Sequence, residues 1–437
     1  MNILYIHTHD TGRYIQPYGF PVPTPRLMSL AREGTLFRQA YTAAPTCSPS
    51  RASLLTGTVP HSCGMLGLAH RGFRLHDYSQ HLVQYLNAQD YETVLCGMHH
   101  ESPDTDDIGY RTVLADFHND EQVRDPLECD VTNAGLAASF LVNRDRSRPF
   151  FLSYGMHATH RTFPSVPEST DTAFVHPPFP IPDTRETRRD TAEYIAAAGI
   201  ADTCIGVVLD ALRRSGEEEN TIVLFVTDHG LAFPQMKCTL YDTGIGVSLI
   251  LKYPGNPKKG GAVDSLVSLI DIYPTLADLI SIPHPPWLQG HSLLPVLRGE
   301  VSEVRDEVFS EITYHAAYQP MRSVRTKRYK FIRNFGPSTP VAANIDDGLT
   351  KDFLLEQGYL NQEIPARMLF DLDLDPTERI NLATSPAHKG IRDDLNARLD
   401  RWMRETDDPL LHGHVPAPAG ARINAQTCIS ADEAVYE

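Results

Sequence analysis

The stretch TIVLFVTDHG, residues 221–230, decides the fold. Residues 222–226 form an uninterrupted apolar run shortly before Asp228, which is typical of a strand buried on both faces. A helix that leads into such a strand indicates a layered α/β sheet. The preceding residues, 190–216, predict that helix, because apolar side chains recur every four or three positions along one face: Tyr194, Ala198, Ala201, Ile205, Val208 and Leu212.

Two further apolar runs have the same form as residues 222–226. Residues 3–6 (ILYI) lead into the polar HTHD, and residues 150–154 (FFLSY) lead into MHATH. In α/β sheets, ligands bind beyond the carboxyl ends of the strands. We therefore expect Asp10, Asp228 and the MHATH segment to lie at one edge of a large, mostly parallel sheet flanked by helices.

The pattern changes near residue 304, which predicts a domain boundary. Residues 308–312 (VFSEI) and 321–335 predict antiparallel strands with one solvent-exposed face, because apolar and basic residues alternate there. A final helix is expected over residues 388–405, followed by a loosely ordered tail. The predicted domains are a catalytic unit, residues 1–303, and a smaller α+β unit built on an antiparallel sheet, residues 304–437.

Composition restricts the partners and the location. The formal net charge of −16 disfavours binding to nucleic acid or to an anionic membrane. The first ten residues show no export signal, and no apolar stretch is expected to span a bilayer. The seven cysteines are scattered without a CxxC pair, which favours a reducing compartment. We expect a cytoplasmic protein, and a dimer is the oligomeric state that we expect.

One cysteine stands in a distinctive string, CSPSRASLLTG, residues 47–57. A free cysteine is most often a small buried hydrophobe, and that is the alternative for Cys47. The string resembles the signature of the sulfatase family, in which the cysteine is oxidised to formylglycine. The segments PMRSV, HSLLPVL and DPTERINLATSP are similar to the heparan N-sulfatases (sulfamidases) of that family, and the resemblance extends over nearly the whole chain.

The resemblance implies an alkaline phosphatase-like fold and a modified Cys47, with a formylglycine-generating enzyme as maturation partner. A hydrated aldehyde carries two hydroxyls on one carbon, so that one can attack sulfur and the other can later expel sulfate. At a helix N-terminus, backbone N–H groups would bind the sulfate. Arg51, one helical turn further, would hold the two hydroxyls by charge-assisted hydrogen bonds.

The resemblance also implies one divalent metal ion. Its expected ligands are His9, Asp10, Asp228, His229 and the modified Cys47. The family usually has Asp-Asp where this chain has His9-Asp10. Calcium is therefore implied by the family, whereas the two imidazoles favour manganese or zinc. The alternative for His9 is that it caps a strand without binding metal.

The proton carriers follow from two further family positions. His100 matches the histidine of a Gly-Lys-x-His string, but Met98 stands where the family has lysine and cannot bind sulfate. Histidine titrates near neutral pH, so His157 is expected to protonate the leaving group and His100 to take a proton from the diol. Lys237 would be the main cation on the sulfate. An ordinary or supporting histidine is the expectation for His99 and the alternative for His160.

The substrate is expected to be a small sulfated saccharide, bound by residues on both sides of the predicted domain boundary. Arg322 lies in PMRSV, a segment similar to one in the sulfamidases whose arginine faces the substrate. The expected substrate-binding residues are His160, Lys237, Glu311, His315 and Arg322.

The predicted function is a formylglycine-dependent sulfatase that acts on a sugar such as N-sulfated or O-sulfated glucosamine. A phosphonate monoester or phosphodiester hydrolase of the same superfamily is one alternative, since His9 and Met98 depart from the sulfatase pattern. A catalytically inactive relative that binds sulfated glycans is the other. The intact CSPSR string argues against the inactive relative, because its main use is to form the aldehyde.

Overall fold

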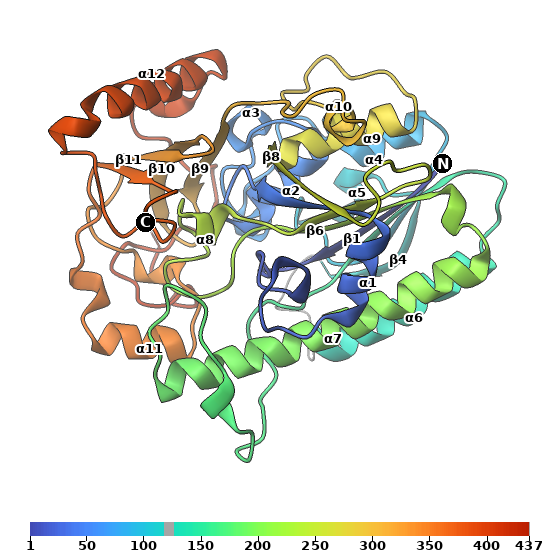
Figure 1. Cartoon of the computed structure of the whole chain (residues 1–437), viewed down its shortest axis with the longest axis horizontal. Helices are drawn as coiled ribbons and strands as arrows, with labels where there is room; N and C mark the ends of the chain where they lie inside the picture. Colours follow the sequence, from blue (N-terminus) through green and yellow to red (C-terminus); the bar gives the residue numbers. More distant parts are fainter. Residues whose placement is uncertain (118–125, 437) are drawn as a thin grey trace.

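The computed structural model describes residues 1–117 and 126–436. Within these residues, an eight-stranded sheet forms the centre of the fold (Figure 1). Neighbouring strands run parallel except at β7, which is antiparallel to both of its neighbours. The sheet is therefore mixed and mostly parallel, as predicted. Its order is β4 (Thr112–Asp116), β3 (Glu92–Gly97), β5 (Phe150–Gly155), β1 (Asn2–Thr8), β6 (Thr221–Thr227), β7 (Leu249–Lys252), β2 (Thr35–Tyr41) and β8 (Gly261–Ser268).

The three predicted apolar runs are the central strands β5, β1 and β6, and every residue in them is buried. Their register brings His7 beside Gly155 and Thr8 beside Thr227, so the three strands end level with one another. The polar segments that follow them therefore begin at one edge of the sheet, as the sequence predicts.

Helices cover both faces of this sheet (Figure 1). On one face, α1 (Pro25–Glu33), α6 (Pro126–Asn143) and α7 (Arg185–Ser215) pack on outward side chains such as Leu4 and Phe225. On the other face, α2 (Cys47–Thr56), α4 (Leu82–Ala88), α9 (Ile272–Leu279) and α10 (Leu294–Leu297) pack on Ile3, Tyr5 and Leu224. Alternate residues of one strand thus supply two separate apolar cores.

Helix α7 begins at a capping box of Thr184 and Thr187 and ends at Gly216, whose φ of 75° is the left-handed conformation that glycine adopts most easily. By length and hydropathy alone it could cross a membrane, which the sequence prediction overlooked. However, 61% of its most apolar window is buried inside the fold, as in the core helix of a globular domain.

The second sheet has four antiparallel strands, in the order β12 (Arg367–Asp371), β11 (Tyr329–Asn334), β10 (Tyr318–Arg325) and β9 (Val308–Tyr314). One face packs on α12 (Lys389–Glu405), where Trp402 stacks on Phe309. The other face packs on the first domain through Met321 and Ile332. This sheet confirms the smaller antiparallel unit, while the boundary at residue 304 stays a prediction.

Two sequence expectations about this second unit are wrong. Lys330, expected on a solvent-exposed face, is fully buried and forms ion pairs with Asp242 at 2.5 Å and Glu378 at 2.8 Å. That face is covered because it packs against the first domain. The tail, expected to be loosely ordered, packs back on the protein: Asn424 N donates to the Ala316 carbonyl, and Cys428 is buried.

Candidate active site

Cys47 is the first residue of α2 and lies at the edge of the sheet where the central strands end. Its Sγ atom is 3.3 Å from Nε2 of His229, and the residue is 3% exposed. Burial raises the pKa of the Cys47 thiol well above its usual value, so the unmodified side chain is a neutral thiol and a poor nucleophile. The preceding Thr46 is extended, which starts the helix at Cys47 and leaves the backbone N–H groups of the first turn without partners within the helix.

Four side chains with metal-binding donors surround Cys47. Asp10 Oδ1 lies 3.2 Å from His229 Nε2 and 3.2 Å from His9 Nδ1. Asp228 Oδ2 lies 3.7 Å from His229 Nε2 and 3.8 Å from His9 Nδ1. Two overlapping groups share Asp10 and Cys47, and within each group the donor atoms all lie within 4.8 Å of one another. One group adds His9 and His160, and the other adds Asp228 and His229. The predicted ligands are therefore brought together, although they come from three separate parts of the chain.

The charges of this cluster suit a cation. Burial alone would raise the pKa of Asp10, but Lys237, His160 and His229 outweigh it and hold that pKa below the usual range. Burial lowers the pKa of His9 well below its usual value, so its ring is neutral and keeps a lone pair for a ligand. His9 Nε2 lies 3.1 Å from His100 Nδ1, a contact that leaves His9 Nδ1 facing the carboxylates. Such a second hydrogen bond orients a metal-binding imidazole.

Arg51 lies beneath the cluster, one helical turn after Cys47. Its Nη2 donates to Asp228 Oδ2 at 2.9 Å and to the Thr8 carbonyl at 3.2 Å, and its Nη1 contacts His7 Nδ1. The side chain is almost fully buried. Arg51 thus fixes the orientation of Asp228, a contact that the sequence did not predict for it.

Lys237 lies on the opposite side of Asp10. Its Nζ donates to Asp10 Oδ2 at 2.8 Å and to Asp346 Oδ1 at 3.0 Å, and it lies 3.3 Å from His160 Nε2. Burial alone would lower the pKa of Lys237, but the two carboxylates raise it well above the usual value. The ammonium is therefore permanently charged and held beside the expected metal ligands.

A cavity of about 370 Å³ opens onto Cys47. Among the predicted residues, His100, His160, Lys237 and His315 line it together with Cys47. His157 lies close by, with its ring 6.4 Å from that of His9 and 5.2 Å from that of His160. The predicted nucleophile position, cation and histidines thus converge on one cavity of suitable size for a small molecule.

Comparison with known proteins agrees with this arrangement. The sulfatase family model matches residues 1–282, and the C-terminal model of N-sulphoglucosamine sulphohydrolase matches residues 229–341. Human N-sulphoglucosamine sulphohydrolase is 30% identical over 89% of this chain and 86% of the human protein. The chain belongs to the sulfatase family. An ulvan-active sulfatase of Formosa agariphila is 28% identical to this sulfatase over 93% of the chain and 75% of the relative.

Solved structures show the same fold as this sulfatase at lower identity. A 2-O GAG sulfatase superposes with a TM-score of 0.74, at 22% identity, over 100% of this chain and 98% of that one. A protein solved in complex with its substrate D-glucosamine-2-N,6-O-disulfate superposes with a TM-score of 0.70, at 19% identity. The match covers 93% of this chain and 98% of that one. The predicted alkaline phosphatase-like fold is confirmed, and homologues of this chain are sulfuric ester hydrolases.

Two predicted substrate-binding residues of the sulfatase lie elsewhere. Arg322 is fully buried and is held by Asp408, at 2.6 Å from Nε, and by Glu311, at 3.0 Å from Nε. Glu311 Oε2 also lies 2.7 Å from His61 Nδ1. Neither Arg322 nor Glu311 lines the cavity, because both are used to join β9 and β10 to the segments around residues 61 and 408. The structure therefore does not bring Arg322 and Glu311 to the Cys47 cavity with the other predicted residues.

Met98 and His99 of the sulfatase are also buried, and neither lines the Cys47 cavity. His99 Nε2 lies 3.0 Å from Thr105 Oγ1 and its Nδ1 lies 3.4 Å from Glu101 Oε2, so it supports the structure beneath the site. The position of the family lysine is thus filled by an apolar side chain in the core.

Several residues at the cavity were not predicted from the sequence. Asp346 contacts Lys237, and Arg71 and Arg422 line the same cavity. Asp130 receives the backbone N–H groups of His157, at 2.9 Å, and Ala158, at 2.8 Å, and so positions the MHATH segment. None of these four lies in a motif with a known chemical role, so the sequence carries no signal that would have selected them.

Proposed function

We propose that this sulfatase is formylglycine-dependent and removes sulfate from a small sulfated sugar, such as a glucosamine with an N-sulfo or O-sulfo group. The observation that carries the proposal is the position of Cys47: it starts a helix, lines a cavity with Lys237, and lies among four metal-binding side chains. The relatives include a human N-sulphoglucosamine sulphohydrolase and an N-acetylglucosamine-6-O-sulfatase of Bacteroides thetaiotaomicron, which supports a sulfated glucosamine.

The neighbouring side chains have separate tasks in this proposal. Formylglycine at position 47 supplies two hydroxyls on one carbon, one for attack on sulfur and one for release of sulfate. Lys237 attracts the sulfate and balances the charge of Asp10. His100 lines the cavity and takes a proton from the second hydroxyl when sulfate is released, while His157 gives a proton to the leaving oxygen or nitrogen. Arg51 keeps Asp228 oriented beneath them.

The donor set favours a divalent metal other than calcium. His9, Asp10, Asp228 and His229 would hold the ion, and a bound cation would lower the pKa of the nucleophile and neutralise sulfate oxygens. Calcium prefers six to eight oxygen ligands, whereas two imidazoles and two carboxylates suit manganese or zinc. We propose manganese or zinc. Elemental analysis of the purified protein, and the thermal midpoint after removal and return of each metal, would measure the preference without relying on turnover.

The test of function uses protein made together with a formylglycine-generating enzyme. Peptide mass should show that residue 47 has lost H₂S and gained oxygen. A panel of N-sulfoglucosamine, glucosamine 6-sulfate, 4-nitrophenyl sulfate, and matched phosphodiesters and phosphonates is then compared by kcat/KM. We expect a sugar sulfate to be the best substrate. A phosphodiester or phosphonate as the best substrate would contradict the proposal, as would full activity of Cys47→Ala.

The cytoplasmic location and the dimeric state stay predictions. Size-exclusion chromatography with light scattering would test the second of these.

A further inference from the structure

A carboxylate that the proposed function does not use lies in the Cys47 cavity. Asp346 Oδ1 accepts a hydrogen bond from Lys237 Nζ at 3.0 Å. Its second oxygen, Oδ2, is buried and has no hydrogen-bond partner among residues 1–117 and 126–436. A buried carboxylate oxygen is costly unless it accepts a hydrogen bond, so Oδ2 is expected to accept one from water or from a molecule in the cavity that displaces it. Because Asp346 lines the cavity, that molecule is the one that enters beside Cys47.

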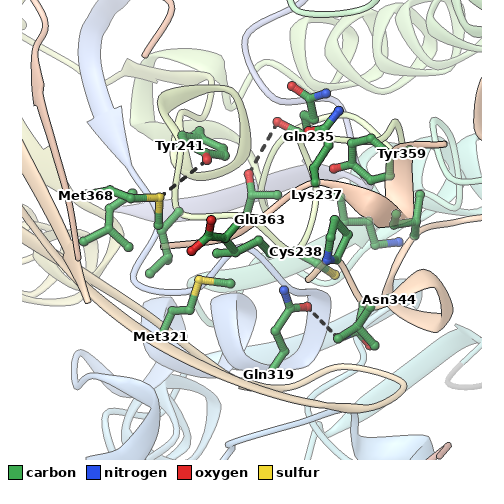
Figure 2. Close-up of a pocket in the computed structure, with 18 residues that line it drawn as sticks. Gln235, Lys237, Cys238, Tyr241, Gln319, Met321, Asn344, Tyr359, Glu363 and Met368 are labelled. Atoms are coloured by element: carbon green, nitrogen blue, oxygen red, sulfur yellow. Dashed lines mark hydrogen bonds between the residues drawn. The ribbon is translucent and has the colours of Figure 1, made fainter. Parts of the chain in front are cut away.

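The backbone that carries Asp346 is held independently of Lys237. Asn344, two residues earlier, donates from Nδ2 to Gln319 Oε1 at 2.9 Å and receives the Ala317 N–H on its Oδ1 at 2.8 Å. Figure 2 shows the Asn344–Gln319 contact on the wall of a smaller, second cavity that Lys237 also borders. Lys351 Nζ donates to the Ile345 carbonyl at 2.7 Å. The position of Asp346 is therefore set in advance, as specific recognition requires.

A second buried polar atom borders the same cavity. His315 Nδ1 also lacks a hydrogen-bond partner within the described residues. Burial, followed by the charge of Lys237, lowers the pKa of His315 well below its usual value, so its ring is neutral. A neutral imidazole nitrogen either donates or accepts. The ionised carboxylate of Asp346 only accepts, and it repels a sulfate oxygen.

Lys237, Asp346 and His315 together present different binding groups to the sulfate and to the sugar of a ligand. Lys237 offers a positive charge to a sulfate, and Asp346 beside it offers an acceptor to a group that carries a hydrogen. A sugar carries hydroxyl or amino groups near its sulfated position, whereas a simple aryl sulfate has none. A hydroxyl can donate to Asp346 while it also bonds to His315.

Resting on the proposed function, we propose that Asp346 is a specificity-determining residue that accepts a hydrogen bond from a hydroxyl or amino group near the sulfated position of the substrate. The ligand class is a sulfated sugar with such a neighbouring donor. In this proposal Asp346 binds the sugar, and Lys237 binds the sulfate.

The test compares the wild type, Asp346→Asn and Asp346→Ala on two substrates. One is the better of N-sulfoglucosamine and glucosamine 6-sulfate, and the other is 4-nitrophenyl sulfate, which has no donor. Loss of a hydrogen bond to a charged group predicts that Asp346→Ala lowers kcat/KM for the sugar about 30-fold. Asp346→Asn keeps one acceptor oxygen and should lose less. The aryl sulfate should change by less than about 3-fold, since it makes no such bond.

A second measurement does not depend on sulfate turnover. Glucosamine, the desulfated sugar, should bind the wild type more tightly than Asp346→Ala by calorimetry, by about 10-fold or more. Asp352→Asn is the matched control, because Asp352 is a solvent-exposed aspartate on α11 (Leu349–Glu356) of the same region and should leave both measurements unchanged. Thermal midpoints of all variants show whether each one is folded.

Three results would overturn the proposal. Equal losses on the sugar and the aryl sulfate would mean that Asp346 acts only through Lys237. Unchanged kinetics and unchanged glucosamine binding would mean that it contacts no ligand. If the protein hydrolyses the aryl sulfate but neither sugar sulfate, the proposed ligand class is wrong. If the wild type hydrolyses no sulfate ester, the proposed function fails, and unchanged glucosamine binding in Asp346→Ala would separately reject the role of Asp346.

Discussion

Replacing Arg322 with methionine should lower the stability of the sulfatase and leave its substrate recognition unchanged. The guanidinium is fully buried, and it contacts Asp408 Oδ2 at 2.6 Å, Asp408 Oδ1 at 3.0 Å and Glu311 Oε2 at 3.0 Å. Arg322→Met removes the cation and leaves both carboxylates buried, with His61 as the remaining partner of Glu311.

The size of the effect follows from this geometry. At an effective dielectric constant of about 20, two charges 3 Å apart attract by about 5 kcal/mol. Desolvation of the guanidinium offsets part of that, and removing one partner of a buried ion pair costs about 3–5 kcal/mol. An unfolding entropy of about 2.1 cal/mol/K per residue over 437 residues converts this loss to a fall in the thermal midpoint of about 4 °C, if the chain unfolds as one unit.

The stability of Arg322→Met is measured by thermal and urea unfolding. Its kcat and KM for a sulfated sugar are measured well below the unfolding temperature. Arg328→Met is the matched control, because Arg328 also borders β11 and pairs with Asp371 at 2.8 Å, but its side chain is half-exposed. We expect the control to lose less than about 1 kcal/mol. A large rise in KM for the sugar with an unchanged thermal midpoint would refute the reasoning, since Arg322 would then contact substrate.

Three further predictions concern the site and its surroundings. His157→Ala should slow hydrolysis of sugar sulfates far more than that of 4-nitrophenyl sulfate, because a good leaving group needs little protonation; equal losses would remove its role as proton donor. Arg422→Ala removes a cation from the cavity and should raise KM for a sugar about tenfold, with little change for the aryl sulfate. Burial raises the pKa of Asp130 from 3.8 to about 7, so its contribution to stability is present at low pH and lost as the pH rises through about 7. Consequently the thermal midpoint of the wild type relative to Asp130→Asn should fall between about pH 4 and pH 7 and level off at higher pH, and a constant difference would contradict this.

The strands and the long helix could be predicted to within a few residues. The apolar run 222–226 became β6, Thr221–Thr227, and the periodic stretch 190–216 became α7, Arg185–Ser215. Both patterns are local, because a buried strand or one apolar helix face is recorded in residues that are close in sequence. The start of α7 was less well predicted, since it depends on the capping contact of Thr184 with Thr187.

The candidate site could be predicted in part. Cys47, Asp10 and Asp228 were found because they lie in a specific string or directly after buried strands. Asp346 and Arg422 were missed, because neither lies in a motif and both reach the cavity from distant parts of the chain.

By itself, the sequence determined the sulfatase family, the cysteine that we propose as the nucleophile and the edge of the sheet at which the polar groups meet. Only the tertiary structure decided which charged residues are buried and which face the cavity. Arg322 and Lys330 have the sequence pattern of a solvated or ligand-binding strand, yet both are buried in ion clusters. The physical reason is that burial of a charge depends on partners supplied by distant segments, and the balance between desolvation and pairing leaves no local pattern.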